Sequence, residues 1–271
     1  MKRLLFSFAL LLVAQSGTRA DILASPWLDF REARIRLLID AEAPEGTLVA
    51  GLEIALADGF KTYWRHAGDS GVPPMFDFDG SQALAGLAVA FPFPERFDDG
   101  AGGKAWGYKH GVILPISGKA ERRDFRLALT LDFAVCGTMC IPLNGTLELS
   151  PTTGTKLAGE EAGRLAAVRS ALPQPDEGRP AEVARIESGK YQWRVTLPYT
   201  GDAAAMTAFA EAKGFLEVET VAAGADGKAV VTISGQPEPG SDGKFGPVRL
   251  TFGTMEKSFE KTLDLDGAPT P

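Results

Sequence analysis

Two cysteines are the residues with the clearest chemical potential in this sequence. Cys136 and Cys140 are its only cysteines, and they flank Gly-Thr-Met in the stretch DFAVCGTMCIPLNG. A thiol pair at this spacing can form a structural disulfide, hold a soft metal ion, or cycle between dithiol and disulfide. Closing a loop of about five residues stabilises a fold by only roughly 2 kcal/mol in the chain-entropy model. Spacing alone therefore leaves all three alternatives open, with a redox function slightly favoured.

The metal alternative has a defined set of donors. Cys136, Met139 and Cys140 are soft ligands suited to Cu(I), and His66 and His110 are the only histidines that could complete a site. Both histidines are far from the cysteines in sequence, and we expect His66 in a loop and His110 in a solvated turn. Sequence patterns of serine hydrolases, zinc proteases and phosphate-binding loops are missing. We therefore expect neither a metal nor a cofactor.

The N-terminus predicts export. Lys2 and Arg3 precede a short apolar run, and small residues at Thr18 and Ala20 fit cleavage after Ala20. The run is shorter than the about 20 residues of a membrane-spanning helix. We thus expect a soluble, exported protein beginning at Asp21.

Charge and length limit the function further. The net charge is −7, and loss of Lys2, Arg3 and Arg19 with the signal peptide makes it −10. This acidic balance argues against nucleic-acid binding. About 250 mature residues can bury an adequate core in one large or two ordinary domains without help from a disulfide.

Apolar residues recur with a period of two through most of the chain. The stretch 48–56 alternates from Leu48 to Leu56, and the stretch 125–135 alternates from Phe125 to Val135. Further strands are expected at 33–39, 87–91, 111–116 and 146–149. Gly- and Pro-rich turns at this spacing predict a mainly β protein, an antiparallel β-sandwich.

The second half predicts a smaller β-rich domain, with a second copy of the same sandwich type as one alternative. A helix is expected at 156–171, followed by a proline-rich linker, and a second helix at 202–213. Strands are expected at 183–187, 191–197, 215–221, 229–234, 248–252 and 257–263. The predicted organisation is a signal peptide at 1–20, a sandwich at 21–150, a helix and linker at 151–180, and a second domain at 181–271.

The cysteines are expected to flank a hairpin bend. Extending the alternation of 125–135 places Cys136 on the face of Asp132 and Ala134, and Cys140 begins the return strand. Two residues so placed are within reach of a disulfide. No lysine or arginine is adjacent in sequence to lower a thiol pKa.

Four motifs in order resemble one protein family. DGFKTYWRHAGDSGVPPMFDF (58–78), FPFPERF (91–97), GYKHGVILPI (107–116) and VCGTMCIPLNGTLEL (135–149) are similar to the N-terminal periplasmic domain of DsbD-type thiol:disulfide interchange proteins. The closer likeness is to the ScsB, or suppressor of copper sensitivity, branch. The likeness covers about residues 25–150.

The resemblance implies an immunoglobulin-like sandwich, with an immunoglobulin-like second domain as one alternative for 181–271. It also implies that the protein is a disulfide-reductase relay in the periplasm. In such a relay Cys140 attacks a partner's disulfide and Cys136 resolves the mixed disulfide. The implied partners are periplasmic thioredoxin-fold proteins, either disulfide isomerase-like or cytochrome c maturation factors. Because this chain lacks the family's membrane segment and thioredoxin-like domain, its electron donor is expected to be a separate membrane or thioredoxin-like protein.

The resemblance also implies aromatic cover over the disulfide. In related domains aromatic-bearing loops shield the active cysteines until a partner docks, and Tyr63, Trp64, Trp106 and Tyr108 are the candidates here. The competing interpretation makes YWRHAGDSGVPP a surface turn and these aromatics part of the core. If active, the protein is a thiol-disulfide oxidoreductase. The alternative is a non-catalytic exported module that binds copper(I) or a protein and carries a structural disulfide.

Overall fold

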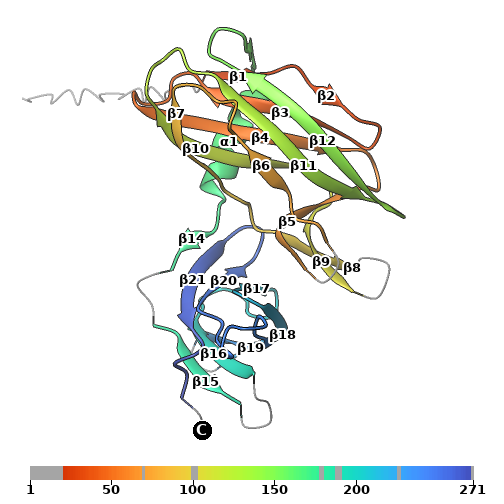
Figure 1. Cartoon of the computed structure of the whole chain (residues 1–271). Helices are drawn as coiled ribbons and strands as arrows, with labels where there is room; N and C mark the ends of the chain where they lie inside the picture. Colours follow the sequence, from red (N-terminus) through yellow and green to blue (C-terminus); the bar gives the residue numbers. More distant parts are fainter. Residues whose placement is uncertain are drawn as a thin grey trace, which may run out of the picture.

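The computed structural model describes residues 21–68, 71–98, 103–176, 180–186, 191–224 and 227–269. The predicted signal peptide lies outside these residues. The described chain is mainly β and forms two lobes, each built from two sheets (Figure 1). This confirms the predicted fold class, an antiparallel β-sandwich followed by a second β-rich part. Within the described residues, no helix is both long enough and apolar enough to cross a membrane.

Two sheets form the first sandwich, which spans residues 22–156. One has the order β13 (Thr155–Lys156), β1 (Ile22–Ala24), β3 (Ala33–Asp40), β4 (Thr47–Leu56), β10 (Val112–Ala120), β7 (Leu84–Val89), with β2 (Leu28–Asp29) paired to β3. The other has the order β12 (Cys140–Leu149), β11 (Leu127–Cys136), β5 (Lys61–Gly68), β9 (Lys104–Tyr108), β8 (Glu95–Asp98), with β6 (Met75–Asp77) paired to β11. The disulfide hairpin thus forms an edge of the second sheet.

The core of this sandwich follows the predicted alternation. On β11, Leu127, Leu129, Leu131, Phe133 and Val135 all belong to the core cluster. Side chains at every second position share one face of a strand, so the period-two pattern selects this face. The strands predicted in this half are confirmed, with shifted ends.

One of the two interpretations of YWRHAGDSGVPP, a surface turn, does not hold for its first half. Strand β5 continues to Gly68, and Trp64 is fully buried. The stretch lacks a clean apolar alternation because residues on both of its faces are covered. Tyr63 packs on one face with Phe97 and Cys136, and Trp64 packs on the other face in the main core, where Phe209 of the second half of the chain contacts it.

The second sandwich is built from residues 174–264. One sheet has the order β14 (Gln174–Pro175), β21 (Ser258–Asp264), β20 (Pro247–Gly253), β17 (Thr207–Glu211). The other has the order β15 (Glu182–Arg185), β16 (Gln192–Pro198), β19 (Lys228–Gln236), β18 (Phe215–Ala223). Trp193, Phe245 and Phe252 are fully buried between them. The domain boundaries at 150 and 181 stay a prediction.

The helix predicted at 156–171 is α1 (Glu160–Ser170). It packs on the outer face of the first sandwich, where Leu165 lies over Gly51 and a Cβ on that glycine would come within 2.8 Å of the leucine. Buried Glu53 binds Arg36, with 2.7 Å between Oε2 and Nε, and also Arg164 of the helix. These contacts fix α1 to the first sandwich.

The helix predicted at 202–213 is wrong. This segment contains a turn in which the Ala204 amide donates to the Asp202 side chain, followed by β17, which pairs with β20. Its alanines have high helix propensity, but propensity is a weak prior that packing overrides. Here Ala208, Phe209 and Ala210 are all buried on the two faces of a strand.

Candidate redox site

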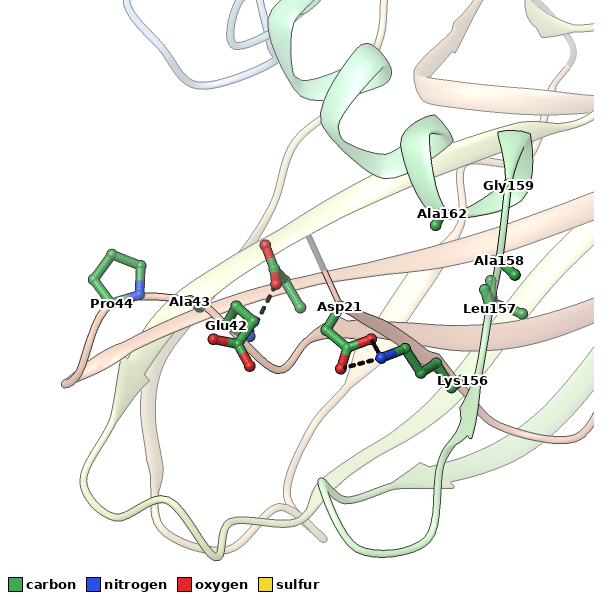
Figure 2. Close-up of a pocket in the computed structure, with 10 residues that line it drawn as sticks. Asp21, Glu42, Ala43, Pro44, Lys156, Leu157, Ala158, Gly159 and Ala162 are labelled. Atoms are coloured by element: carbon green, nitrogen blue, oxygen red, sulfur yellow. Dashed lines mark hydrogen bonds and ion pairs between the residues drawn. The ribbon is translucent and has the colours of Figure 1, made fainter. Parts of the chain in front are cut away.

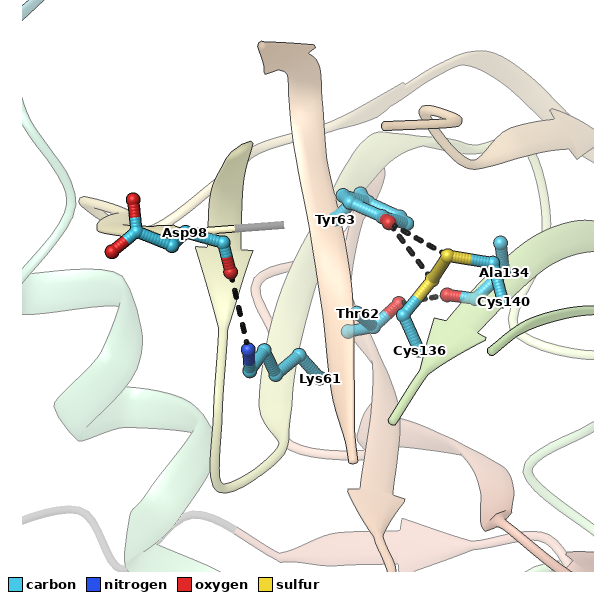
Figure 3. The surroundings of a disulfide bond; sticks show 7 residues. All are labelled: Lys61, Thr62, Tyr63, Asp98, Ala134, Cys136 and Cys140. Atoms are coloured by element: carbon cyan, nitrogen blue, oxygen red, sulfur yellow. Dashed lines mark hydrogen bonds between the residues drawn. A yellow bond between two sulfur atoms is a disulfide. The ribbon is translucent and has the colours of Figure 1, made fainter. Parts of the chain in front are cut away.

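The hairpin joins the two cysteines directly. Cys136 ends β11 and Cys140 begins β12, and their Cα atoms are paired across the ladder at 4.1 Å. The Gly137 amide donates to the Met139 carbonyl oxygen and closes the bend. The sulfur atoms form a disulfide (Figure 3). The predicted three-residue connection is confirmed, and in this state neither sulfur is a thiolate ligand for a metal.

The two sulfur-bearing residues differ in exposure. Cys136 is 7% exposed and shares a small core cluster with Ala134, the face that the alternation predicted. Cys140 is exposed, and Met139 beside it, at the tip of the hairpin, is 74% exposed. An incoming thiol therefore reaches the sulfur of Cys140 more easily than that of Cys136.

Tyr63 is the predicted aromatic that lies on the disulfide. Its hydroxyl oxygen is 2.8 Å from Cys136 Sγ and 3.2 Å from Cys140 Sγ, as Figure 3 shows. Disulfide sulfurs carry no hydrogen, so the hydroxyl is the donor in both contacts. Its neighbour Thr62 donates through Oγ1 to the Ala134 carbonyl oxygen at 2.9 Å, which ties β5 to β11. A hydrogen-bond donor is thus fixed beside the more buried sulfur.

The other three predicted aromatics lie in the main core. Trp64, Trp106 and Tyr108 belong to the large cluster of the first sandwich, whereas Tyr63 belongs to the cluster of Cys136. The Tyr108 hydroxyl donates to the Pro92 carbonyl oxygen at 2.9 Å, and burial raises the pKa of Tyr108 well above its usual value. The structure therefore brings one of the four candidates to the sulfurs and places three behind it.

Sequence reasoning missed two residues at this site. Phe97 on β8 is 8% exposed and joins the cluster of Tyr63 and Cys136, with its ring centroid 6.4 Å from that of Tyr63. Lys61 is the Cα partner of Cys136 on β5, and its ammonium lies over the Phe97 ring at 4.8 Å. Phe97 stands in the FPFPERF motif, which was a usable signal. Lys61 is distant in sequence, so only the strand pairing places it there.

Gly107 of β9 makes the close approach of β9 to β5 possible. It is paired with Tyr63, and a Cβ at this position would meet the Thr62 carbonyl oxygen at 1.9 Å. A side chain there would push β5 away from β9. The glycine therefore helps to set the position of the tyrosine.

The two histidines lie in different surroundings, and neither belongs to a group of possible metal ligands among the described residues. The His66 ring packs against Trp106, with centroids 5.0 Å apart, on a strand rather than in the predicted loop. His110 is in the bend after β9. The described residues contain no group of three or more histidine, cysteine, aspartate or glutamate side chains arranged to hold a metal ion.

A hollow of about 790 Å³ lies at another place on the first sandwich. Its lining includes Asp21, Glu42 and Lys156, and the Asp21–Lys156 ion pair crosses it at 2.7 Å (Figure 2). The lining comes from the residue before β1, the end of β3 and the turn after it, and the stretch from β13 to the start of α1. It shares no residue with the disulfide hairpin, so the hollow adds nothing to the redox site.

Two comparisons with known proteins found a match. Residues 34–151 match the family described as thiol:disulfide interchange protein DsbD, N-terminal. The fold is similar to the crystal structure of the N-terminal periplasmic domain of ScsB from Proteus mirabilis, with a TM-score of 0.71 and 21% sequence identity over 90% of this chain and 98% of that one. A search of curated proteins found no match.

The resemblance predicted from the four motifs is confirmed by both matches. The family match ends at residue 151 and contains β5, β8, β9 and the disulfide hairpin. The family match supports a thiol:disulfide interchange module in the first sandwich, and the structural likeness shows a shared fold.

Proposed function

We propose that residues 34–151, which are similar to the DsbD N-terminal family, act as a disulfide-reductase relay through Cys136 and Cys140. One observation carries the proposal: the disulfide has one exposed end at Cys140 and one buried end at Cys136, beside a hydroxyl donor. A bond that only stabilises the fold needs no such asymmetry. A bond that is opened repeatedly benefits from it, because attack is directed to one sulfur and the other leaves as thiolate.

Reductive opening follows from this asymmetry. The thiolate of an electron donor attacks Cys140 Sγ, the bond between the two sulfurs breaks, and Cys136 leaves as thiolate. The Tyr63 hydroxyl, 2.8 Å from Cys136 Sγ, donates a hydrogen bond to the negative charge that develops there. The donor's second thiolate then attacks the donor sulfur of this mixed disulfide, so the donor's disulfide forms and Cys140 leaves as thiolate. Two electrons enter the pair, and solvent supplies the two protons.

Electron delivery reverses these roles. The Cys140 thiolate attacks the disulfide of a partner and forms a mixed disulfide, and the partner's second sulfur leaves as thiolate. Cys136 then attacks Cys140 Sγ and restores the disulfide, which releases the partner as a dithiol. In this cycle Cys140 attacks and Cys136 resolves, the order that the resemblance implies.

The partners and location follow from the same family likeness. The proposed site of action is the periplasm, after export by the signal peptide. Electrons would come from a separate membrane or thioredoxin-like donor and pass to thioredoxin-fold proteins of the disulfide isomerase or cytochrome c maturation type. A contribution to copper tolerance is part of this proposal, through the ScsB branch.

Cover by aromatic side chains limits unproductive oxidation in this proposal. Tyr63 and Phe97 pack at the Cys136 end, while Trp64, Trp106 and Tyr108 support them from the core. An oxidant or thiol that does not dock on the hairpin surface therefore reaches Cys140 and not Cys136.

The Tyr63→Phe variant tests the hydroxyl donor. It keeps the ring and removes the hydrogen bond, so the Cys136 thiolate loses stabilisation. We expect reduction by dithiothreitol to slow about tenfold, since hydrogen bonds to charged groups contribute about 1.5–3 kcal/mol. Stopped-flow or quenched alkylation assays measure this rate. A rate equal to that of the unmodified protein would remove Tyr63 from the mechanism.

The reduction potential tests the proposed function as a whole. Equilibration of the purified protein in glutathione buffers, followed by alkylation and mass spectrometry, gives the potential of the pair. A relay requires a potential above about −300 mV, the region below which stable structural disulfides lie. A lower value would favour the alternative, an exported binding module with a structural disulfide.

A further inference from the structure

Strand β17 of the second sandwich divides its side chains between two cores. Ala208 and Ala210 belong to the core of the second sandwich. Phe209, between them, is fully buried in the core cluster of the first. Its ring centroid lies 4.9 Å from that of Trp106 and 5.5 Å from that of Trp64. Neighbouring residues of a strand point to opposite faces, so β17 packs against both sandwiches at once.

Arg65 on β5 makes a second, ionic contact with the second sandwich. Its guanidinium donates to Glu211 at 2.7 Å, to Thr251 Oγ1 at 3.0 Å and to Glu260 at 2.5 Å. Burial lowers the pKa of Arg65, but its hydrogen bonds and ion pairs with Glu211 and Glu260 outweigh burial and raise the pKa above the usual value. A forked, fully charged contact of this kind fixes the strand in direction as well as in distance.

These two contacts act on an irregular part of β5. The register between β5 and β9 shifts between Tyr63 and Gly68, and the pairing of β5 with β11 covers the residues before Tyr63. Side-chain contacts therefore fix the part of β5 that follows Tyr63. The first two residues of that part, Trp64 and Arg65, both contact the second sandwich.

We propose that the second sandwich positions the redox site, with Phe209 and Arg65 holding β5 so that the Tyr63 hydroxyl stays within reach of the sulfurs. Both are positioning residues, since neither touches the disulfide. The inference rests on the proposed function for its biological meaning. In the oxidised protein, loosening the contact between the two sandwiches should slow the opening of the disulfide, although the sulfurs and Tyr63 are unchanged.

The test compares variants by their rate of reduction with dithiothreitol. Arg65→Met removes the ionic contact, and Phe209→Leu weakens the aromatic one while keeping an apolar side chain. Arg36→Met is the matched control: like Arg65, Arg36 binds two carboxylates, Glu53 and Glu161, but it is buried and lies on the other sheet. Circular dichroism and thermal unfolding establish that each variant is folded.

We expect Arg65→Met and Phe209→Leu each to slow reduction about threefold or more. A slowing of this size corresponds to one hydrogen bond, that of the Tyr63 hydroxyl, which is no longer well placed. Arg36→Met should leave the rate unchanged despite a similar loss of stability. In the Tyr63→Phe background, Arg65→Met should have no further effect, because the hydroxyl that it positions is already missing. If Arg65→Met does not fold, Phe209→Leu alone completes both comparisons.

Two outcomes would overturn the inference. In the first, Arg65→Met and Phe209→Leu are reduced as fast as Arg36→Met, or faster than the unmodified protein. The other is slowing that is equally large with and without the Tyr63 hydroxyl, which would show an effect independent of the tyrosine. These rates require no protein partner. A failure of the relay in partner assays would therefore leave them intact, and the two proposals fail separately.

Discussion

Replacing Cys140 with serine is expected to abolish disulfide exchange with thioredoxin-fold proteins. The thiolate is the nucleophile in exchange, and a serine hydroxyl cannot take its place. Cys136 would keep its thiol, but it is 7% exposed and lies under Tyr63. We expect the rate to fall by more than about a thousandfold, to the level of a variant without either cysteine. The measurement follows the reduction of an oxidised thioredoxin-fold protein by the reduced variant.

The exposed neighbour of Cys140 supplies the control for this prediction. Met139 is 74% exposed at the hairpin tip, and Met139→Ala should keep the exchange chemistry with small thiols. A Cys140→Ser protein that still reduces its partner at a rate near that of the unmodified protein would show that Cys136 attacks, contrary to the geometry.

The second large effect concerns stability rather than chemistry. Phe209→Ala should lower the free energy of unfolding by about 3–5 kcal/mol, as is typical of a buried phenylalanine replaced by alanine. The loss arises in the core of the first sandwich, where the ring contacts Trp64 and Trp106. We expect urea unfolding followed by tryptophan fluorescence to show the loss.

A phenylalanine on the next strand along the chain gives the matched substitution. Phe215 on β18 is 43% exposed, and Phe215→Ala should change the free energy of unfolding by no more than about 0.5 kcal/mol. Equal losses for the two variants would mean that Phe209 does not join the two cores.

The sequence predicted the hairpin site well because its signals are local. The alternation of 125–135 places Cys136 on the face of Ala134, and the bend at Gly137 to Met139 brings Cys140 opposite. Period-two patterns and turn residues act over a few positions, so they are visible without a fold.

The other parts of the site depend on pairing between distant strands. Lys61 lies opposite Cys136, and Phe97 joins Tyr63, only after β5, β8, β9 and β11 have assembled. The four predicted aromatics also divide according to strand face. Tyr63 points to the disulfide cluster and its neighbour Trp64 to the core. A sequence does not show this division when both faces of a strand are covered.

The segment 202–213 was mispredicted for a related reason. Its alanines suit a helix in isolation, but β17 is a strand because β20 pairs with it and because two cores need its two faces. Contacts between distant parts of the chain decide such a segment, and local propensity does not.

The most direct test of the relay is the capture of a mixed disulfide at Cys140. A reduced Cys136→Ser protein, mixed with a purified thioredoxin-fold disulfide isomerase in its oxidised form, should attack but fail to resolve. We predict a covalent complex on non-reducing gels whose peptide cross-link maps to Cys140, and no such complex from the Cys140→Ser protein. Equal yields of complex from both variants, or no complex from either, would contradict the account.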